Sequence, residues 1–265
     1  MRTFIFLVLT LAIPGFIFCR PFVNYDKEPL KAVIIVGPQE DETSTSIKDM
    51  YKVVEFLKSK GVVVHCYYDR NTDWNQIVKA SQDASILIYD GHGSDDCGFN
   101  LKESVSAVEI KKSLHLKKNA LVLFQSVCNG AGSSAGDLKD IGLAEAERRV
   151  TKYAKTFIES GAGCYFAINS VDGVYDFLND FFDGSTVNKC FENSAEDFYD
   201  IEKVQNSSLG QNLHIGIASS YWEGTNTLIT YTNGVKKVEK VPSVKSYNIA
   251  YISKKDFSLK NLEEN

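Results

Sequence analysis

Between residues 31 and 168, short apolar runs alternate with longer segments in which apolar residues recur at helical intervals. The first run, residues 32–36, ends at Gly37-Pro38, and the segment 46–59 that follows has a helical spacing of apolar residues. A strand that is buried on both faces has a continuous apolar sequence, and strands that alternate with helices are typical of βαβ units. The sequence therefore predicts an α/β protein with a mostly parallel central sheet.

Five apolar runs are expected to form the strands of this sheet: 32–36, 62–68, 85–89, 120–125 and 165–168. Helices are expected over 46–59, 74–80, 107–115, 141–160, 174–182 and 190–198. A strand over 214–218, and a hairpin over 227–232 and 235–241 that turns at Asn233-Gly234, predict a small β extension towards the C-terminus.

Length and charge limit the domain organisation and the partners. The chain has 265 residues, of which 44% are hydrophobic, so one large domain over residues 20–245 is expected to form its own core. The last twenty residues, 246–265, contain several lysines and are expected to be a peripheral tail. A net charge of −5 argues against binding to nucleic acid or to an anionic membrane, because both select a basic face.

The N-terminus has the pattern of a signal peptide. Met1-Arg2-Thr3 provides a basic start, and the apolar run that follows is shorter than the roughly 20 residues that a membrane-spanning helix requires. Residues 1–19 are therefore expected to be a cleaved signal peptide, with lipid attachment at Cys19 as the less favoured alternative. The mature protein is expected to be secreted or otherwise exported (extracellular, periplasmic or in an endomembrane lumen), without a membrane attachment.

The cysteine count points to a free thiol. Of the six cysteines, Cys19 is expected to leave with the signal peptide, and an odd set of five remains. At least one of these thiols must stay free or pair between chains. Cys66 and Cys164 lie within apolar runs, where cysteine behaves as a small hydrophobic residue. Cys128 alone has a setting that favours chemistry.

A histidine and a cysteine follow two consecutive strands of the predicted sheet. His92 lies in Tyr-Asp-Gly-His-Gly after the strand 85–89, and Cys128 lies in Gln-Ser-Val-Cys-Asn-Gly after the strand 120–125. Catalytic residues of open α/β sheets collect at the carboxyl ends of the strands, and right-handed crossovers bring consecutive strands together. A thiol requires an adjacent base to supply thiolate at neutral pH, and imidazole is the commonest one. The sequence therefore predicts a Cys–His catalytic pair.

Glycines around both residues allow close approach of a substrate carbonyl. A tetrahedral intermediate requires preorganised N–H donors for its oxyanion. The backbone N–H groups of Gly93 and Cys128 are the candidates for this oxyanion hole.

These two blocks resemble the caspase-like cysteine peptidases, which include caspases, legumains, gingipains, clostripain, separase and CHAT domains. The resemblance covers residues 31–170 and rests on an apolar strand leading to His92-Gly93 and a second leading to Cys128. Gly-His-Gly-Ser and the glycine-rich segment after the cysteine are closer to the gingipain and CHAT branches. Legumains usually carry Asp before His, and caspases have glutamine where Ser126 stands.

The resemblance implies a caspase-like, flavodoxin-like α/β/α sandwich that hydrolyses protein or peptide substrates. His92 would be the base, Cys128 the nucleophile that forms an acyl-enzyme, and no cofactor would be required. The pocket for the residue before the cleaved bond would be formed by the loop 39–46, by Ser126 and by 169–172, so its candidate residues are Asp41, Ser126, Asn169 and Asp172. Acidic side chains here, including Glu40 and Glu42, would favour a basic substrate residue, and a solvated loop is the alternative.

Two other functions fit parts of the sequence. The segment 132–136 matches the Gly-x-Ser-x-Gly motif of serine hydrolases at Ser134, but it lacks the strand that must precede the serine directly. A caspase-like domain that binds a peptide or partner without catalysis is the other alternative, because a fold does not determine a function.

No spacing of Cys and His resembles a zinc site. Calcium remains an option through Asp95 and Asp96, or Asp180 and Asp183. Asn206-Ser207-Ser208 is a glycosylation sequon if the host is a eukaryote.

Overall fold

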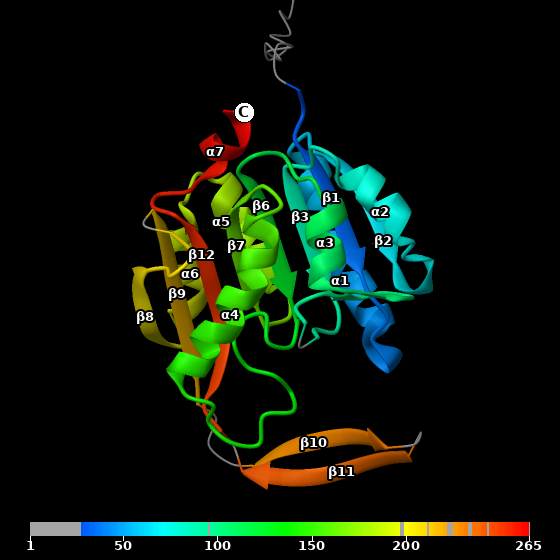
Figure 1. Ribbon diagram of the computed structural model, residues 1–265, viewed down its shortest axis with the longest axis vertical. Coiled ribbons are helices and arrows are strands. Elements are labelled where there is room, and N and C mark those ends of the chain that lie inside the picture. The colour runs from blue at the N-terminus through cyan, green and yellow to red at the C-terminus, as the bar shows by residue number, and fades with distance from the viewer. Residues whose placement is uncertain are drawn as a thin grey trace, which may run out of the picture.

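The computed structural model describes residues 28–94, 96–196, 199–210, 212–221, 225–232, 235–242 and 244–264. The expected signal peptide, residues 1–19, lies outside these ranges, as do Asp95 and the turn Asn233-Gly234. Within them, an eight-stranded sheet is covered by helices on both faces (Figure 1). The predicted α/β/α sandwich is confirmed.

The sheet has the strand order β2-β1-β3-β6-β7-β12-β9-β8. Its first five strands are parallel: β2 (Val63–Tyr68), β1 (Lys31–Val36), β3 (Ile86–Asp90), β6 (Ala120–Gln125) and β7 (Ala162–Ile168). The remaining three, β12 (Ser246–Lys254), β9 (Leu213–Ser220) and β8 (Asp200–Asn206), are each antiparallel to the preceding neighbour. The sheet is therefore mostly parallel, as the apolar runs predict.

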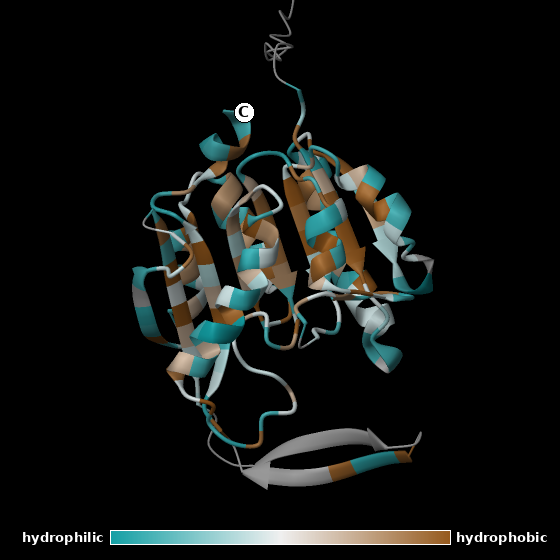
Figure 2. Cartoon of the chain, in the orientation of Figure 1, coloured by the Kyte–Doolittle hydropathy of each residue, from teal (hydrophilic) through white to brown (hydrophobic). Residues whose placement is uncertain are grey.

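Each face of the sheet has its own core. One core packs against α2 (Trp74–Ser81), α3 (Ala107–Ser113) and α4 (Leu143–Ile158). The other packs against α1 (Thr43–Ser59), α5 (Gly173–Phe182), α6 (Val187–Ala195) and the short α7 (Leu259–Glu263). Figure 2 shows apolar residues concentrated on the central strands and polar residues on the outer helix surfaces. All residues of β1, β3 and β6 except Lys31 are buried because helices cover both faces, which explains their continuous apolar runs.

The prediction that residues 246–265 form a peripheral tail is wrong. Ser246–Lys254 forms β12, which lies between β7 and β9 inside the sheet. Ile249, Ala250 and Ile252 on this strand are fully buried. Polar Ser and Asn residues interrupt the apolar pattern of the strand, and the lysines that follow it lie outside the core, so composition was a misleading guide.

The C-terminal β region is larger than the small extension that the sequence predicts. β8 was not predicted, and together with β9 and β12 it extends the main sheet. The expected hairpin is confirmed as β10 (Thr225–Thr232) paired antiparallel with β11 (Val235–Pro242). Figure 1 shows this hairpin projecting from the body of the protein beyond the lower end of the sheet.

Among the described residues, no helix is both long enough and apolar enough to cross a bilayer.

Candidate active site

The carboxyl ends of β3 and β6 lie side by side. The two strands pair in parallel, with Asp90 opposite Gln125 as the last pair. His92 follows β3 by two residues, and Cys128 follows β6 by three. The expectation that neighbouring strands deliver these two residues to one edge of the sheet is confirmed.

The segment after β3 presents His92 on the surface. Gly91 is buried, His92 is exposed, and Gly93 is partly buried. The chain then turns through the short antiparallel pair β4 (Phe99–Asn100) and β5 (Ser104–Val105) before α3 begins. The imidazole is therefore accessible to a substrate.

A tight turn presents Cys128, which is partly buried. Ser126 and Asn129 on either side of it have left-handed backbone angles, with φ of 57° and 66°. Such angles are uncommon for residues with a Cβ and are found where the surrounding structure imposes them. Here the Ser126 N–H donates to Ile168 O at 3.0 Å and the Gly130 N–H donates to Val127 O at 2.9 Å. These bonds reverse the chain directly after β6 and turn the cysteine out of the sheet.

The two segments meet at Gly93 and Cys128. A Cβ atom placed on Gly93 would lie 2.0 Å from the Cys128 carbonyl oxygen and 2.9 Å from its carbonyl carbon. No side chain fits at such a distance, so only glycine allows the two backbones to touch here. The contact makes Gly93 a structural necessity of the site as well as a candidate donor.

Two backbone donors at this contact have no hydrogen-bond partner among the described residues. Neither the Gly93 N–H nor the Cys128 N–H donates a hydrogen bond to any described residue. Most backbone N–H groups in folded proteins are paired, so two free donors on touching segments are notable. The His92 imidazole and the Cys128 thiol are likewise not hydrogen-bonded to each other or to other described side chains.

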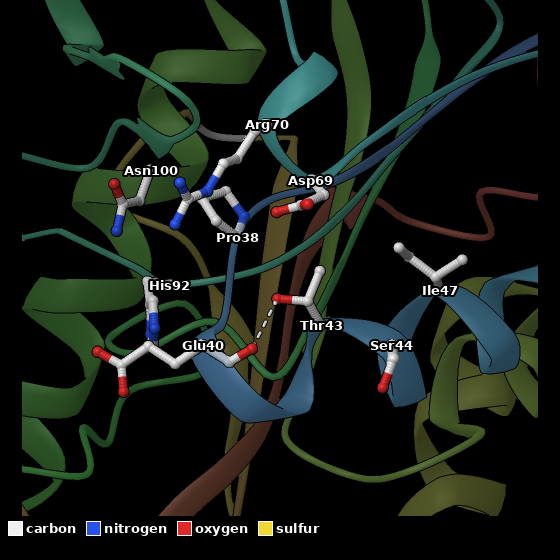
Figure 3. A pocket seen from close by; sticks show the side chains of 9 residues that line it. All are labelled: Pro38, Glu40, Thr43, Ser44, Ile47, Asp69, Arg70, His92 and Asn100. Carbon is white, nitrogen blue, oxygen red and sulfur yellow. Dashed lines mark hydrogen bonds between the residues drawn. The ribbon is translucent and has the colours of Figure 1, made fainter.

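A hollow of about 540 Å³ adjoins His92 (Figure 3). Its walls come from the segments after β1 and β2, from the start of α1 and from β4. The lining residues are Pro38, Glu40, Thr43, Ser44, Ile47, Asp69, Arg70, His92 and Asn100. Glu40 and Asp69 contribute carboxylates and Arg70 contributes a guanidinium, so the hollow is polar and of mixed charge.

Left-handed backbone angles recur around this hollow. Glu40, in the short helix Glu40–Glu42, has φ of 53°, and Asp69, in the short helix Asp69–Asn71, has φ of 54°. The structure thus holds two carboxylate residues in uncommon conformations beside His92. The loop with Glu40 was among the segments predicted to form the pocket, whereas Asp69, Arg70 and Asn100 were not, because they reach the hollow through the pairing of β2 with β1 and through the fold of the loop that contains β4.

Asp90 is a buried carboxylate beneath the site, with only 1% of its surface exposed. The Nε2 atom of Gln39 donates to its Oδ1 at 3.1 Å, and Nε2 of Gln125 donates to its Oδ2 at 3.4 Å. Burial raises the pKa of Asp90 to about 6, although these two amides and Ser46 act in the opposite direction. In the sequence, the only indication of this carboxylate is its position at the end of the apolar run 86–90.

Ser126, Asn169 and Asp172, three of the four candidate pocket residues, are not among the residues that line the hollow beside His92. Ser126 is exposed on the Cys128 turn. Asn169 follows β7, bonds through Nδ2 to Asn248 Oδ1 at 3.4 Å, and has a buried Oδ1 without a partner. Asp172 pairs with Lys52 of α1 at 2.9 Å and faces α1 rather than the hollow. Asp41 lies in the helix Glu40–Glu42, and its side chain is outside the described part of the structure.

Ser134 does not occupy a nucleophile elbow. It lies in the loop between β6 and α4, where its N–H donates to Asp137 Oδ2 at 2.7 Å and its hydroxyl accepts from the Gly136 N–H at 3.3 Å. The elbow requires a strand, a sharp turn and a helix in direct succession. The described chain between Gln125 and Leu143 does not provide that succession.

The candidate calcium carboxylates are engaged by protein groups. Asp96 accepts from Ser94 Oγ, Asp180 from Asn193 Nδ2 at 2.8 Å, and Asp183 pairs with Lys60 at 3.3 Å. Among the described residues, no group of three or more His, Cys, Asp or Glu side chains is arranged to hold a metal ion.

Comparison with known proteins places the chain in no family. No family model matches the sequence, and no curated protein matches it. Among solved structures it is similar to a short-chain flavodoxin associated with a bacterial microcompartment, at 14% identity and a TM-score of 0.30, over 50% of this chain and 77% of that one.

Proposed function

We propose that this protein is a secreted cysteine endopeptidase that acts through Cys128 and His92 and forms an acyl-enzyme. The observation that carries the proposal is the contact between Gly93 and the Cys128 carbonyl, where neither N–H group donates a hydrogen bond to a described residue. The resemblance of the two sequence blocks to caspase-like peptidases gives independent support. Nucleophile, base and oxyanion donors are the parts that acyl transfer requires.

In the first half-reaction, His92 takes the proton from the Cys128 thiol, and the thiolate attacks the carbonyl carbon of the peptide bond. The oxyanion that forms accepts hydrogen bonds from the Gly93 and Cys128 N–H groups. Collapse of this intermediate breaks the C–N bond. The leaving amine takes the proton from the His92 imidazolium, and the substrate remains bound as a thioester.

In the second half-reaction, His92 removes a proton from a water molecule that attacks the thioester. Collapse of the second tetrahedral intermediate breaks the C–S bond, and the Cys128 sulfur takes a proton back from His92. The products are a carboxylic acid and the regenerated thiol. His92 is exposed, and catalytic hydrogen bonds often tighten only when substrate binds.

The substrate preference that we propose is a basic residue before the cleaved bond. Glu40 is the acidic candidate that lines the hollow beside His92, whereas the Asp172 carboxylate is already paired with Lys52. A carboxylate on the rim of such a hollow attracts an Arg or Lys side chain. The preference is modest, because Arg70 lies in the same hollow and opposes it.

A cleavage profile on a peptide library tests this function. Wild type is compared with Cys128→Ala and with Cys66→Ala, which removes a thiol on the exposed edge strand β2. We expect wild type and Cys66→Ala to cleave the same peptides, and Cys128→Ala to be slower by more than about a thousandfold.

Hydrolysis that survives Cys128→Ala contradicts the proposal. If the folded wild-type protein cleaves nothing but retains peptides in a pull-down from the library, the caspase-like domain without catalysis becomes the better description.

A further inference from the structure

Three buried tyrosines place their hydroxyl groups under the two segments of the candidate site. Tyr89 comes from β3, Tyr153 from α4 and Tyr165 from β7, and each is fully buried. A buried hydroxyl is costly unless it is hydrogen-bonded, so the partners of these groups are structurally important. Each hydroxyl is hydrogen-bonded to backbone atoms of residues 92–100 or of Gly130.

The Tyr89 hydroxyl donates to the carbonyl oxygen of His92 at 2.8 Å and accepts from the Asn100 N–H at 3.0 Å. The His92 carbonyl belongs to the same peptide group as the Gly93 N–H. Because a trans peptide is planar, its C=O and N–H point in opposite directions. Fixing the His92 oxygen from below therefore fixes the direction of the Gly93 N–H.

The Tyr153 hydroxyl holds the next residue along. It accepts from the Ser94 N–H at 2.8 Å and donates to the Ser94 carbonyl at 3.0 Å. The Ser94 N–H belongs to the peptide on the other side of Gly93. A Cβ on Gly93 would lie 2.9 Å from this hydroxyl, so the tyrosine also contacts the glycine itself. Both peptides that flank Gly93 are thus held by tyrosine hydroxyls.

The rings of these tyrosines are fixed by one phenylalanine. Phe124 on β6 lies 5.5 Å from Tyr89, 5.7 Å from Tyr153 and 5.2 Å from Tyr165, measured between ring centroids. Tyr165 donates to the Gly130 carbonyl at 2.9 Å and so ties the Cys128 turn to the same cluster. Burial raises the pKa of Tyr89 and Tyr153, so both remain protonated donors at neutral pH.

We propose that Tyr89 and Tyr153 are positioning residues that orient the Gly93 N–H as an oxyanion donor. The inference rests on the proposed peptidase function and goes beyond it by assigning a role to two residues that touch no substrate. The hydrogen bond from Tyr89 also polarises the His92–Gly93 peptide, because hydrogen bonds in a chain strengthen one another. The two tyrosines therefore affect the reaction only when negative charge develops on the substrate oxygen that the Gly93 N–H binds.

The test compares Tyr89→Phe and Tyr153→Phe with a matched control, Tyr251→Phe. Tyr251 lies on β12, outside the site, and is also buried. Its hydroxyl donates to Asn188 Oδ1 at 2.8 Å. Each substitution removes one buried hydroxyl group, which makes two hydrogen bonds at Tyr89 and at Tyr153 and one at Tyr251, so thermal melts are used to verify that the three variants fold. The measurements are kcat and KM for a peptide cleaved by wild type, the affinity for a peptide aldehyde, and the alkylation rate of Cys128 by iodoacetamide.

An aldehyde adduct carries an oxyanion, whereas alkylation by iodoacetamide does not require the oxyanion hole. We expect Tyr89→Phe and Tyr153→Phe to lower kcat and aldehyde affinity by about tenfold, less than the loss of a donor itself, with KM and the alkylation rate within twofold of wild type. Tyr251→Phe retains the wild-type values of all four quantities.

Unchanged kcat and aldehyde affinity in Tyr89→Phe overturn the inference and leave the peptidase in place. Losses that Tyr251→Phe reproduces overturn it as well, because they show a general effect of stability. Failure of the proposed function gives a different result, because wild type then shows no hydrolysis that depends on Cys128. In that case the inference is also wrong.

Discussion

The backbone of Gly93 touches the carbonyl group of Cys128, so that a Cβ on the glycine would lie 2.0 Å from the cysteine oxygen. This contact joins the segment that follows β3 to the segment that follows β6. It also brings together the Gly93 and Cys128 N–H groups, which donate no hydrogen bond within the described part of the chain. The proposed oxyanion hole depends on it directly.

Gly93→Ala is expected to destabilise the protein by about 3 kcal/mol or more, because neither the Cys128 backbone nor the fixed Tyr153 hydroxyl can move away easily. Urea denaturation measures the change. Gly136→Ala is the matched control, since the nearest atom to its Cβ would be Ser134 Oγ at 3.9 Å. Equal stability of the two variants would show that the contact is looser than described.

The contribution of Asp90 to the stability of the protein should fall as the pH rises from about 4 to about 6, because burial raises the pKa of its carboxyl from 3.8 to about 6. The folded state binds the Asp90 proton more tightly than the unfolded state does. The stabilisation from this proton is therefore complete below pH 3.8, the pKa in the unfolded chain, and is lost as the pH rises past about 6, the pKa in the folded protein. Its size is about 3 kcal/mol at most.

Asp90→Asn isolates this contribution from other titrating groups, among them Asp49, whose charge also raises the pKa of Asp90. Urea midpoints from pH 4 to pH 7 should decline less in the variant than in wild type. Parallel curves for the two proteins would mean that Asp90 does not titrate in this range.

Glu40→Gln should reduce kcat/KM for peptides with Arg or Lys before the cleaved bond by about two- to fivefold, as expected for one partly exposed charge pair. Peptides with a neutral residue there should be unaffected. Asp172→Asn serves as the comparison, because its carboxylate pairs with Lys52 and faces away from the hollow. A larger loss for Asp172→Asn than for Glu40→Gln would assign the charge recognition to the loop after β7 instead.

Arg149 on α4 should hold the loop that follows Cys128. Its guanidinium donates to both Asp137 oxygens, at 2.8 and 3.1 Å, and to the Gly132 carbonyl at 3.2 Å. Its side chain is 18% exposed and that of Asp137 is 15% exposed, so Arg149→Met leaves a poorly solvated carboxylate. We expect a loss of about 1–3 kcal/mol and faster protease cleavage within residues 133–142. Arg148→Met, on the exposed side of α4, should change neither.

The parallel half of the sheet could be predicted because its strands are buried on both faces. In β1, β3 and β6 every residue except Lys31, Asp90 and Gln125 is apolar, and the sequence shows this without any knowledge of the partner strands. β12 has the same environment at Ile249 and Ala250, yet Ser246 and Asn248 interrupt its apolar run, and its pairing with β7 is a contact across more than eighty residues. Local pattern does not report such long-range pairing.

The two candidate catalytic residues could be predicted from the sequence, but the residues that position their backbone could not. His92 and Cys128 follow apolar runs, and the topology rule for consecutive strands places them at one edge. The hydroxyls of Tyr89 and Tyr153 are recognisable as supports only once β3 and α4 are packed around Phe124. Asp69 and Arg70 reach the hollow because β2 lies next to β1, which the apolar pattern of β2 alone does not specify.

The most direct measurement of the central claim is covalent labelling of the folded protein with a peptide that carries a thiol-reactive ketone, followed by mass-spectrometric mapping of the modified residue. We expect one label per chain, on Cys128. It should form at the wild-type rate in Cys66→Ala and Ser134→Ala and at least about a hundredfold more slowly in His92→Ala, where the thiol has lost its base. A Cys128 that stays unmodified in the folded wild-type protein, or that reacts equally fast without His92, would contradict it.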